Sequence, residues 1–160
     1  MRNDPTRTRD PAQPEELARQ WLIGKWISGV DAEIHRITIH FESGEASLTP
    51  FNAELQILNL SGARFGDVEE WKDELAGAEG FNSEQAAQRG LLVNWSLRQT
   101  ETVRDVSISS GGALCIHFPS VTLTLTAITS KRWSDSWSLS CNQSHTGIVT
   151  GETEGSLRIG

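Results

Sequence analysis

Hydrophobic and polar residues alternate in two separate stretches of the chain, and each stretch predicts a β-hairpin. In residues 37–50, two isoleucines and a phenylalanine alternate with threonine and histidine, and a Ser-Gly turn leads into a returning strand. This two-residue period is typical of a strand with one buried face. Residues 113–118 and 121–128 repeat the pattern, with three threonines opposite a valine and two leucines.

The two hairpins share the tripeptide Ile-His-Phe, which indicates an internal duplication. It occurs at residues 39–41 and again at residues 116–118. Turn-forming residues and an alternating strand follow each copy. We therefore predict two related halves, at about residues 22–62 and 91–160.

Short helices are predicted where the alternation stops. Proline suits the first turn of a helix and glycine suits its end, so Pro14 and Gly24 bound the first helix. Residues 63–90 predict a helical connection between the halves, with its second helix beginning at Ser83 and ending at Gly90. Further strands are predicted at residues 26–30, 51–60, 103–109, 133–141, 145–150 and 155–159.

These elements predict a mainly β (α+β) fold, with two related antiparallel β-meander halves joined by short helices in a single domain at residues 14–160. Residues 1–13 are polar and predict a disordered arm. The strand at residues 51–60 is apolar on both faces, so we expect it in a central or fully covered position. A sandwich, a barrel and one continuous sheet all fit the pattern.

The formal net charge of −7 changes the range of expected partners. It argues against general nucleic-acid binding, which needs a basic surface, and is compatible with a basic protein partner. Acidic surfaces also keep proteins soluble, so charge alone does not identify a partner. No apolar run reaches the roughly 20 residues of a membrane helix, and the polar start does not resemble a secretory signal. We therefore expect a cytoplasmic protein without membrane contact. The sequence does not predict its oligomeric state.

No motif predicts catalysis, a cofactor or a metal. Cys115 and His117 share one strand face, as a nucleophile and its base would, and Cys115 could bond to Cys141 only if their strands pair. His40 and His117 occupy equivalent places in the two hairpins, whereas His35 and His40 face opposite ways. Zinc needs three or four converging ligands, which no spacing here supplies. We therefore expect no enzyme activity, cofactor or metal.

The chain has six tryptophans and no tyrosine. We expect most tryptophans in the core, and an exposed one would indicate a binding hot spot because indole offers a large contact area. Trp133, Asp135 and Trp137 alternate along one predicted strand face. They are the predicted lining of a pocket between the two halves.

The clearest candidate surface is an acidic segment at residues 67–79, which has six carboxylates and one lysine. Residues 67–75 predict a short amphipathic helix with its charges toward solvent. A solvated helix face would explain these charges, and so would a docking patch for a basic partner. The predicted partner-binding residues are Asp67, Glu69, Glu70, Asp73 and Glu74.

The order of residues in the C-terminal half resembles a bacterial β-rich domain family of unknown function. The family pattern has a Gly-x-Leu-x-hydrophobic-x-Phe strand, an alternating strand, an acidic-x-Trp strand and a closing Gly-x-Leu. This chain departs from the pattern at Asp135, where the family has glutamate, and it lacks a Pro-Gly turn before the last strand. The matching segments are residues 103–108, 112–118, 121–125, 135–139 and 155–157.

Small, acidic proteins with few motifs also resemble immunity proteins, which neutralise a cognate toxin by binding it. The resemblance implies no catalytic residues. We therefore predict a non-enzymatic immunity protein that covers a basic toxin domain. The alternatives are a small-molecule or nucleotide-binding module with a Trp-lined pocket, an acidic DNA mimic, and an enzyme using Cys115, His117 or Asp135.

Overall fold

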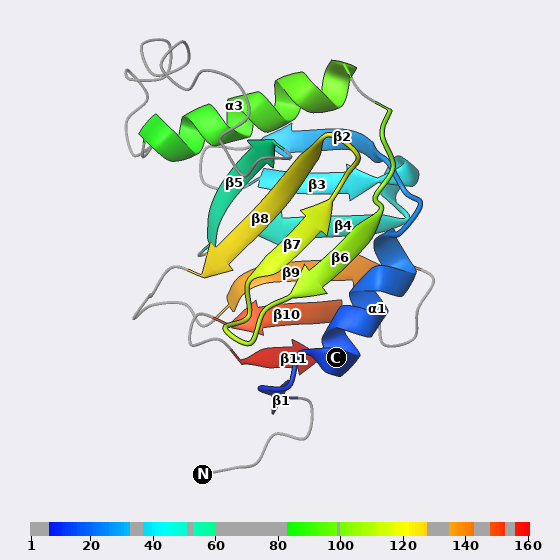
Figure 1. Cartoon of the computed structure of the whole chain (residues 1–160), viewed down its shortest axis with the longest axis vertical. Helices are drawn as coiled ribbons and strands as arrows, with labels where there is room; N and C mark the ends of the chain where they lie inside the picture. Colours follow the sequence, from blue (N-terminus) through cyan, green and yellow to red (C-terminus); the bar gives the residue numbers. More distant parts are fainter. Residues whose placement is uncertain are drawn as a thin grey trace.

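Two antiparallel sheets pack face to face in the computed structural model, and the two described α-helices, α1 (Ala12–Leu22) and α3 (Ser83–Arg98), lie against them (Figure 1). Helix α1 contacts β6, β10 and β11, whereas helix α3 contacts β5 and β2. The fold is therefore mainly β, as the alternating pattern predicts. The structure describes residues 7–32, 37–50, 53–59, 83–98, 100–127, 135–142, 148–152 and 156–160.

Within the described residues, the larger sheet has seven strands in the order β1-β11-β10-β9-β4-β3-β2. The smaller sheet has four described strands, in the order β5-β8-β7-β6. The strands of the larger sheet are β1 (Arg7–Thr8), β2 (Ile27–Ala32), β3 (Ile37–Phe41), β4 (Ala46–Pro50), β9 (Asp135–Cys141), β10 (Ile148–Glu152) and β11 (Leu157–Ile159). Those of the smaller sheet are β5 (Ala53–Asn59), β6 (Asp105–Ile108), β7 (Leu114–His117) and β8 (Val121–Ala127).

Each sheet contains a three-stranded meander with a histidine on its central strand, and β9, β10 and β11 form a further meander in the larger sheet. The first meander is β2, β3 and β4, and the second meander is β6, β7 and β8. The strand after each meander crosses to the other sheet, so β5 pairs with β8 and β9 pairs with β4. The two sheets therefore do not correspond to the two predicted halves of the sequence, because each sheet has strands from both.

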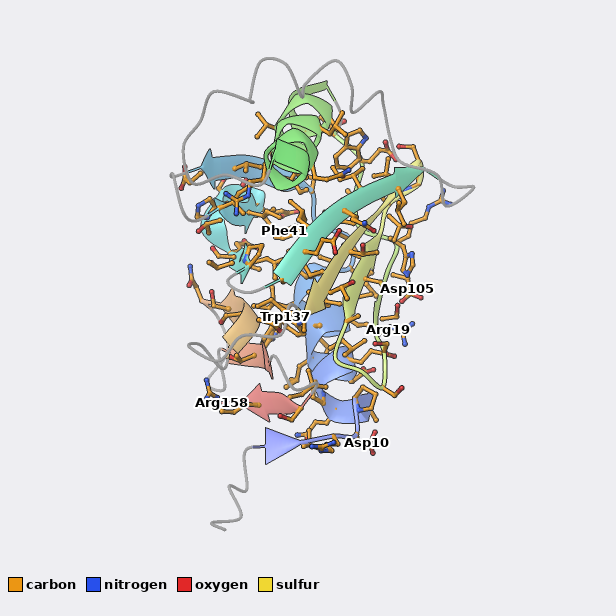
Figure 2. The ribbon with its side chains drawn as sticks, turned by 90° about the vertical axis from the view of Figure 1, so that its left-hand side faces the viewer. Asp10, Arg19, Phe41, Asp105, Trp137 and Arg158 are labelled. Carbon is orange, nitrogen blue, oxygen red and sulfur yellow. The ribbon has the colours of Figure 1, made fainter. Side chains whose placement is uncertain are left out.

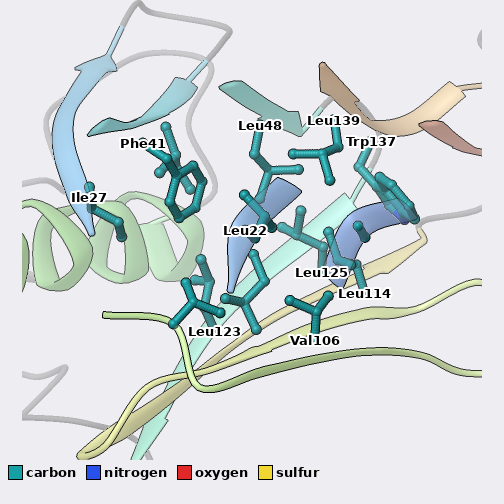
Figure 3. Packing of buried hydrophobic residues seen from close by; sticks show 14 of the residues in the cluster. Leu22, Ile27, Phe41, Leu48, Val106, Leu114, Leu123, Leu125, Trp137 and Leu139 are labelled. Carbon is teal, nitrogen blue, oxygen red and sulfur yellow. The ribbon is translucent and has the colours of Figure 1, made fainter. Parts of the chain in front are cut away.

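The core lies between the two sheets, where the apolar side chains of both alternating patterns meet (Figure 3). Phe41, Leu48 and Trp137 come from the larger sheet, and Leu123 comes from the smaller one. Figure 2 shows Phe41 and Trp137 in the space between the sheets. Burying one such side chain stabilises the fold by roughly 1.5–3 kcal/mol, which fixes the register of each strand.

Helix α1 (Ala12–Leu22) fills one side of this core with Trp21 and Leu22. It is also fixed to β6, since the Glu15 carboxylate accepts a hydrogen bond from the Ile108 amide at 2.9 Å. Gly24 has a φ of 84° and follows the helix end, as its position in the sequence predicts.

The predicted disordered arm is wrong for residues 7–13. Strand β1 pairs with β11, and Thr8 lies opposite Leu157. The Asp10 carboxylate then accepts a hydrogen bond from the Ala12 amide at 3.0 Å, where α1 begins. Polar composition suggested disorder, but backbone pairing to a sheet edge needs no apolar side chain. Residues 1–6 lie outside the described part.

Helix α3 (Ser83–Arg98) corrects two predictions. It continues through Gly90, because burial of Leu91, Leu92 and Trp95 offsets the cost of about 1 kcal/mol for a helical glycine. It also lies against β5, which is the edge strand of the smaller sheet as described, so of the two predicted positions, central or fully covered, the central one is wrong. The Ile57 amide donates to the Gln88 side-chain oxygen at 3.0 Å, so the helix covers this edge.

Candidate functional site

The predicted acidic docking segment lies outside the residues that the structure describes. This applies to Asp67, Glu69, Glu70, Asp73 and Glu74. Their role in partner binding therefore stays a prediction from the sequence.

Of the three residues predicted to line a tryptophan pocket, the structure describes Trp137 and the backbone of Asp135. Trp137 is fully buried, and its indole N–H donates to the Gly112 carbonyl at 3.0 Å. It packs in the core and has no exposed surface with which to contact a ligand. Asp135 begins β9 and lies opposite Glu152, whereas Trp133 lies outside the described residues.

The two cysteines are free thiols, and their strands, β7 and β9, lie in different sheets and do not pair. Cys115 and His117 share the outer face of β7, as predicted, and both are half-buried. Burial raises the pKa of the Cys115 thiol, although a hydrogen bond with Ser107 acts in the opposite direction. A raised pKa reduces the thiolate fraction, and thiolate is the nucleophilic form.

Each meander has one histidine on its central strand, bonded to both neighbouring strands. In the second meander, the His117 ring nitrogens lie 3.3 Å from the Ser107 hydroxyl and 3.2 Å from the Thr122 hydroxyl. His117 is directly opposite Thr122 in the sheet register. The histidine therefore links three strands on the outer face of the smaller sheet.

The histidine of the first meander makes the same cross-strand contacts, with a carboxylate in place of one hydroxyl. His40 Nδ1 lies 3.1 Å from the Ser47 hydroxyl, and His40 Nε2 lies 2.7 Å from Asp31 Oδ2. With the ring proton on Nε2, the histidine donates to Asp31 and accepts from Ser47. An acid, an imidazole and a hydroxyl in a row is also the arrangement that activates a hydroxyl in nucleophilic catalysis.

The comparison between the two histidines favours a structural role for this row. His117 links its neighbours in the same way with no carboxylate. The Asp31 side chain is 78% exposed, so solvent screens its charge. Cross-strand hydrogen bonding is therefore what the two clusters have in common.

Two large apolar side chains in the described part of the chain are exposed, and they lie close together in the sequence. Ile23 is 44% exposed and Trp26 is 38% exposed. Backbone bonds join this segment to the entry of the second meander: the Gly24 amide donates to Val103 at 2.9 Å, and the Val103 amide donates to Lys25 at 2.8 Å. Trp26 is thus presented on a fixed backbone.

The turn between β3 and β4 lies beside Trp26 and has an unusual backbone. It forms a short 3₁₀ helix, η1 (Glu42–Gly44), in which Glu42, Ser43 and Gly44 have φ values of 44°, 58° and 92°. A left-handed backbone costs roughly 1–2 kcal/mol for each non-glycine residue. The Glu42 amide donates to the Trp26 carbonyl at 3.1 Å, so the strained turn adjoins the backbone of Trp26.

Several contacts hold the strained turn in place. The Ser43 amide donates to the Ser28 hydroxyl at 2.8 Å, and the Asn142 side chain donates to the Gly44 carbonyl at 2.6 Å. Lys25 and Glu45 form an ion pair at 2.7 Å, which also connects the turn to the segment of Trp26. Strained backbone held by its surroundings is found preferentially at functional sites.

We define the Trp26 surface as Ile23, Trp26, Glu42 and Ser43. It combines exposed apolar area, one carboxylate and a rigid turn, which are features of a protein-binding site. The sequence does not indicate this surface, because alternation at residues 26–30 gives no sign that the indole is exposed. The positive φ values also occur at Glu42 and Ser43, and neither residue type indicates a left-handed turn as glycine does.

The remaining chemistry in the described residues is limited. Within those residues, no group of three or more His, Cys, Asp or Glu side chains could hold a metal ion. No described helix is long and apolar enough to span a bilayer.

Comparisons of the chain with family models, with curated proteins and with solved structures found no match. The resemblance to a bacterial β-rich family therefore stays a prediction.

Proposed function

We propose that the protein is a non-enzymatic inhibitor of the immunity type, which binds a basic toxin domain and covers it. The observation that carries this proposal is the Trp26 surface. An exposed tryptophan beside a rigid turn offers a large contact area at low cost in conformational entropy. The proposal places the protein in the cytoplasm of the cell that it protects.

The charge of the chain supports the choice of a basic partner. A net charge of −7 speeds encounter with a positively charged protein and disfavours acidic ones. The acidic segment at residues 67–79 is proposed as a second contact, which adds long-range attraction to the apolar contact at Trp26.

The hydrogen bonding of the catalytically capable side chains supports a binding role over catalysis. His40 and His117 each bridge three strands, and burial disfavours the thiolate of Cys115. The two histidines thus have a structural role in the sheets, and a protein that acts by binding a partner needs no catalytic role for them or for Cys115.

The predicted duplication is also a proposal, and the structure offers support for it. Both meanders carry Ile-His-Phe at the end of the central strand, with Phe118 just beyond β7, and each histidine faces a hydroxyl residue on the following strand. The strands that leave them, β5 and β9, exchange between the sheets in the same way. We propose that two copies of one unit exchanged their last strands.

Co-expression with the product of the adjacent gene tests the function. We expect the wild-type protein to restore growth and to co-purify as a complex with that product. Trp26→Ala should weaken the complex at least tenfold, whereas Thr126→Ala, at an exposed position on β8, should not. Absence of both rescue and complex formation would reject the immunity function.

A further inference from the structure

The Trp26 surface contains an indole and a carboxylate at neighbouring positions on adjacent segments. Ile27 and Phe41 are the last register partners of β2 and β3. Just beyond them, the Glu42 amide donates to the Trp26 carbonyl at 3.1 Å, so the backbones of these two residues are adjacent. A ligand at this point would therefore meet an aromatic ring and a negative charge together.

The carboxylate of Glu42 is not neutralised by the charged groups around it. Lys25, which precedes Trp26 in the sequence, pairs with Glu45 at 2.7 Å. No ion pair or hydrogen bond involves the Glu42 carboxylate in the described part of the structure. The strained turn thus presents one uncompensated negative charge beside the exposed indole.

This combination fits a guanidinium group better than other common ligands. A cation over an indole face gains roughly 0.5–1 kcal/mol at exposed sites and more when solvent is excluded. Arginine is planar, stacks on aromatic rings and bonds a carboxylate through two N–H groups, whereas lysine is a more strongly hydrated point charge. A basic partner would supply such a side chain.

We propose that Trp26 and Glu42 form a binding site for an arginine side chain of the partner. This inference rests on the proposed function, because it assigns the chemistry by which the basic partner is recognised. The arginine stacks on the Trp26 indole and forms an ion pair with Glu42. Ile23 contributes apolar contact at the edge of the site.

The second meander provides an internal contrast. In the first meander, Gly29 lies opposite His40, and Trp26 precedes Gly29 by three residues. In the second meander, Asp105 lies opposite His117, and Thr102 precedes Asp105 by three residues. Thr102 is therefore the counterpart of Trp26, with which it forms an isolated bridge. The residue after Phe118 is proline, where the residue after Phe41 is Glu42. The second meander therefore lacks both the ring and the carboxylate at the positions that would bind arginine.

The test is a titration of the ¹⁵N-labelled full chain with a blocked hexa-arginine peptide, followed by NMR and compared with hexa-lysine. Trp26→Phe assigns the Trp26 indole signal. We expect that signal and the Glu42 amide to shift, and arginine to bind several-fold more tightly than lysine. Trp26→Ala and Glu42→Gln should each weaken binding by about fivefold to tenfold.

Glu16→Gln is the matched control, because it removes the same charge at an exposed position on α1. The site is rejected if Glu16→Gln weakens binding as much as Glu42→Gln, or if the Trp26 signal does not move. Melting curves of each variant separate lost binding from lost folding.

The two proposals fail in different ways. If the toxin binds with equal affinity to wild type and Glu42→Gln, the arginine site is wrong and the immunity function stands. If the peptide binds at Trp26 while the adjacent gene product does not bind, the site stands and the immunity function is wrong.

Discussion

The first and second meanders share their interior and differ at their outer ends. Each buries its alternating apolar residues between the sheets and connects its three strands through a histidine. At the end of the first meander, Trp26 and Glu42 are available to a partner. At the corresponding end of the second, the Glu101 carboxylate accepts hydrogen bonds from the Ser120 amide, at 2.7 Å, and from the Ser120 hydroxyl.

This difference separates the residues that fold the protein from those proposed to act. A feature present in both meanders is explained by the packing that both need. A feature present in only one, such as an exposed indole on a strained turn, needs another explanation, and binding supplies it.

The largest expected effect tests whether the interiors are equivalent. Leu48 and Leu123 lie opposite Ile39 and Ile116, respectively, and both are fully buried. Leu48→Ala and Leu123→Ala should each lower the free energy of unfolding by about 2–5 kcal/mol, because each removes buried methyl groups and leaves a cavity. Urea denaturation measures this.

Thr124→Ala, on the outer face of β8, is the control for that pair and should cost less than about 0.5 kcal/mol. A large loss of unfolding free energy for one leucine variant and almost none for the other would show that the interiors of the two meanders are not packed equivalently.

A smaller effect should distinguish the two acidic residues at the meander ends. Glu101→Ala should destabilise the fold by about 1–2 kcal/mol, since it leaves the Ser120 amide without its charged acceptor. Glu42→Ala should change stability by less than about 0.5 kcal/mol, because its carboxylate has no partner in the described residues. Equal losses of stability for Glu101→Ala and Glu42→Ala, measured by thermal unfolding, would contradict this difference between the two meander ends.

Relief of strain in the first turn should have a positive effect of similar size. Ser43 has a φ of 58°, which glycine adopts without steric cost, so Ser43→Gly should raise stability by about 1 kcal/mol. Ser120→Gly should instead lower stability, because it removes the hydroxyl bonded to Glu101. A fall in melting temperature for Ser43→Gly would show that the turn is not strained.

The smallest expected effect is a pH dependence confined to the second meander. Burial raises the pKa of Cys115, so above the ordinary thiol value of about 8.5 the unfolded chain ionises before the folded chain does. Stability should be unaffected by this thiol below that pH and fall above it.

Cys115→Thr introduces the residue found at the equivalent position of the first meander, Thr38. This variant should lack the fall in stability at high pH that comes from the Cys115 thiol. Unfolding free energies between about pH 7 and 10 provide the measurement. Parallel curves for wild type and Cys115→Thr would contradict the assignment to Cys115.

The two hairpins were predictable from sequence because a two-residue period fixes both the strand and its buried face. The end of α3 was not, since tertiary burial of Leu91 and Leu92 outweighs the local preference of Gly90. The exchange of β5 and β9 between sheets was also hidden, because alternation gives the face of a strand and not its neighbour.

The candidate site was harder to predict than the fold. Trp26 lies in an alternating segment like the buried residues, but it is exposed, and its backbone forms an isolated bridge with the distant Thr102. The left-handed turn at Glu42 and Ser43 depends on distant contacts from Ser28 and Asn142. Neither relation is local in sequence, so no pattern of neighbouring residues indicates them.

Hydrogen–deuterium exchange of the complex with the toxin tests the central claim most directly, because it compares both meander ends in one experiment. The account predicts slower exchange at residues 23–28 and 42–45 on binding, and unchanged exchange at residues 100–104 and 118–121. Protection of the second set without the first would contradict it.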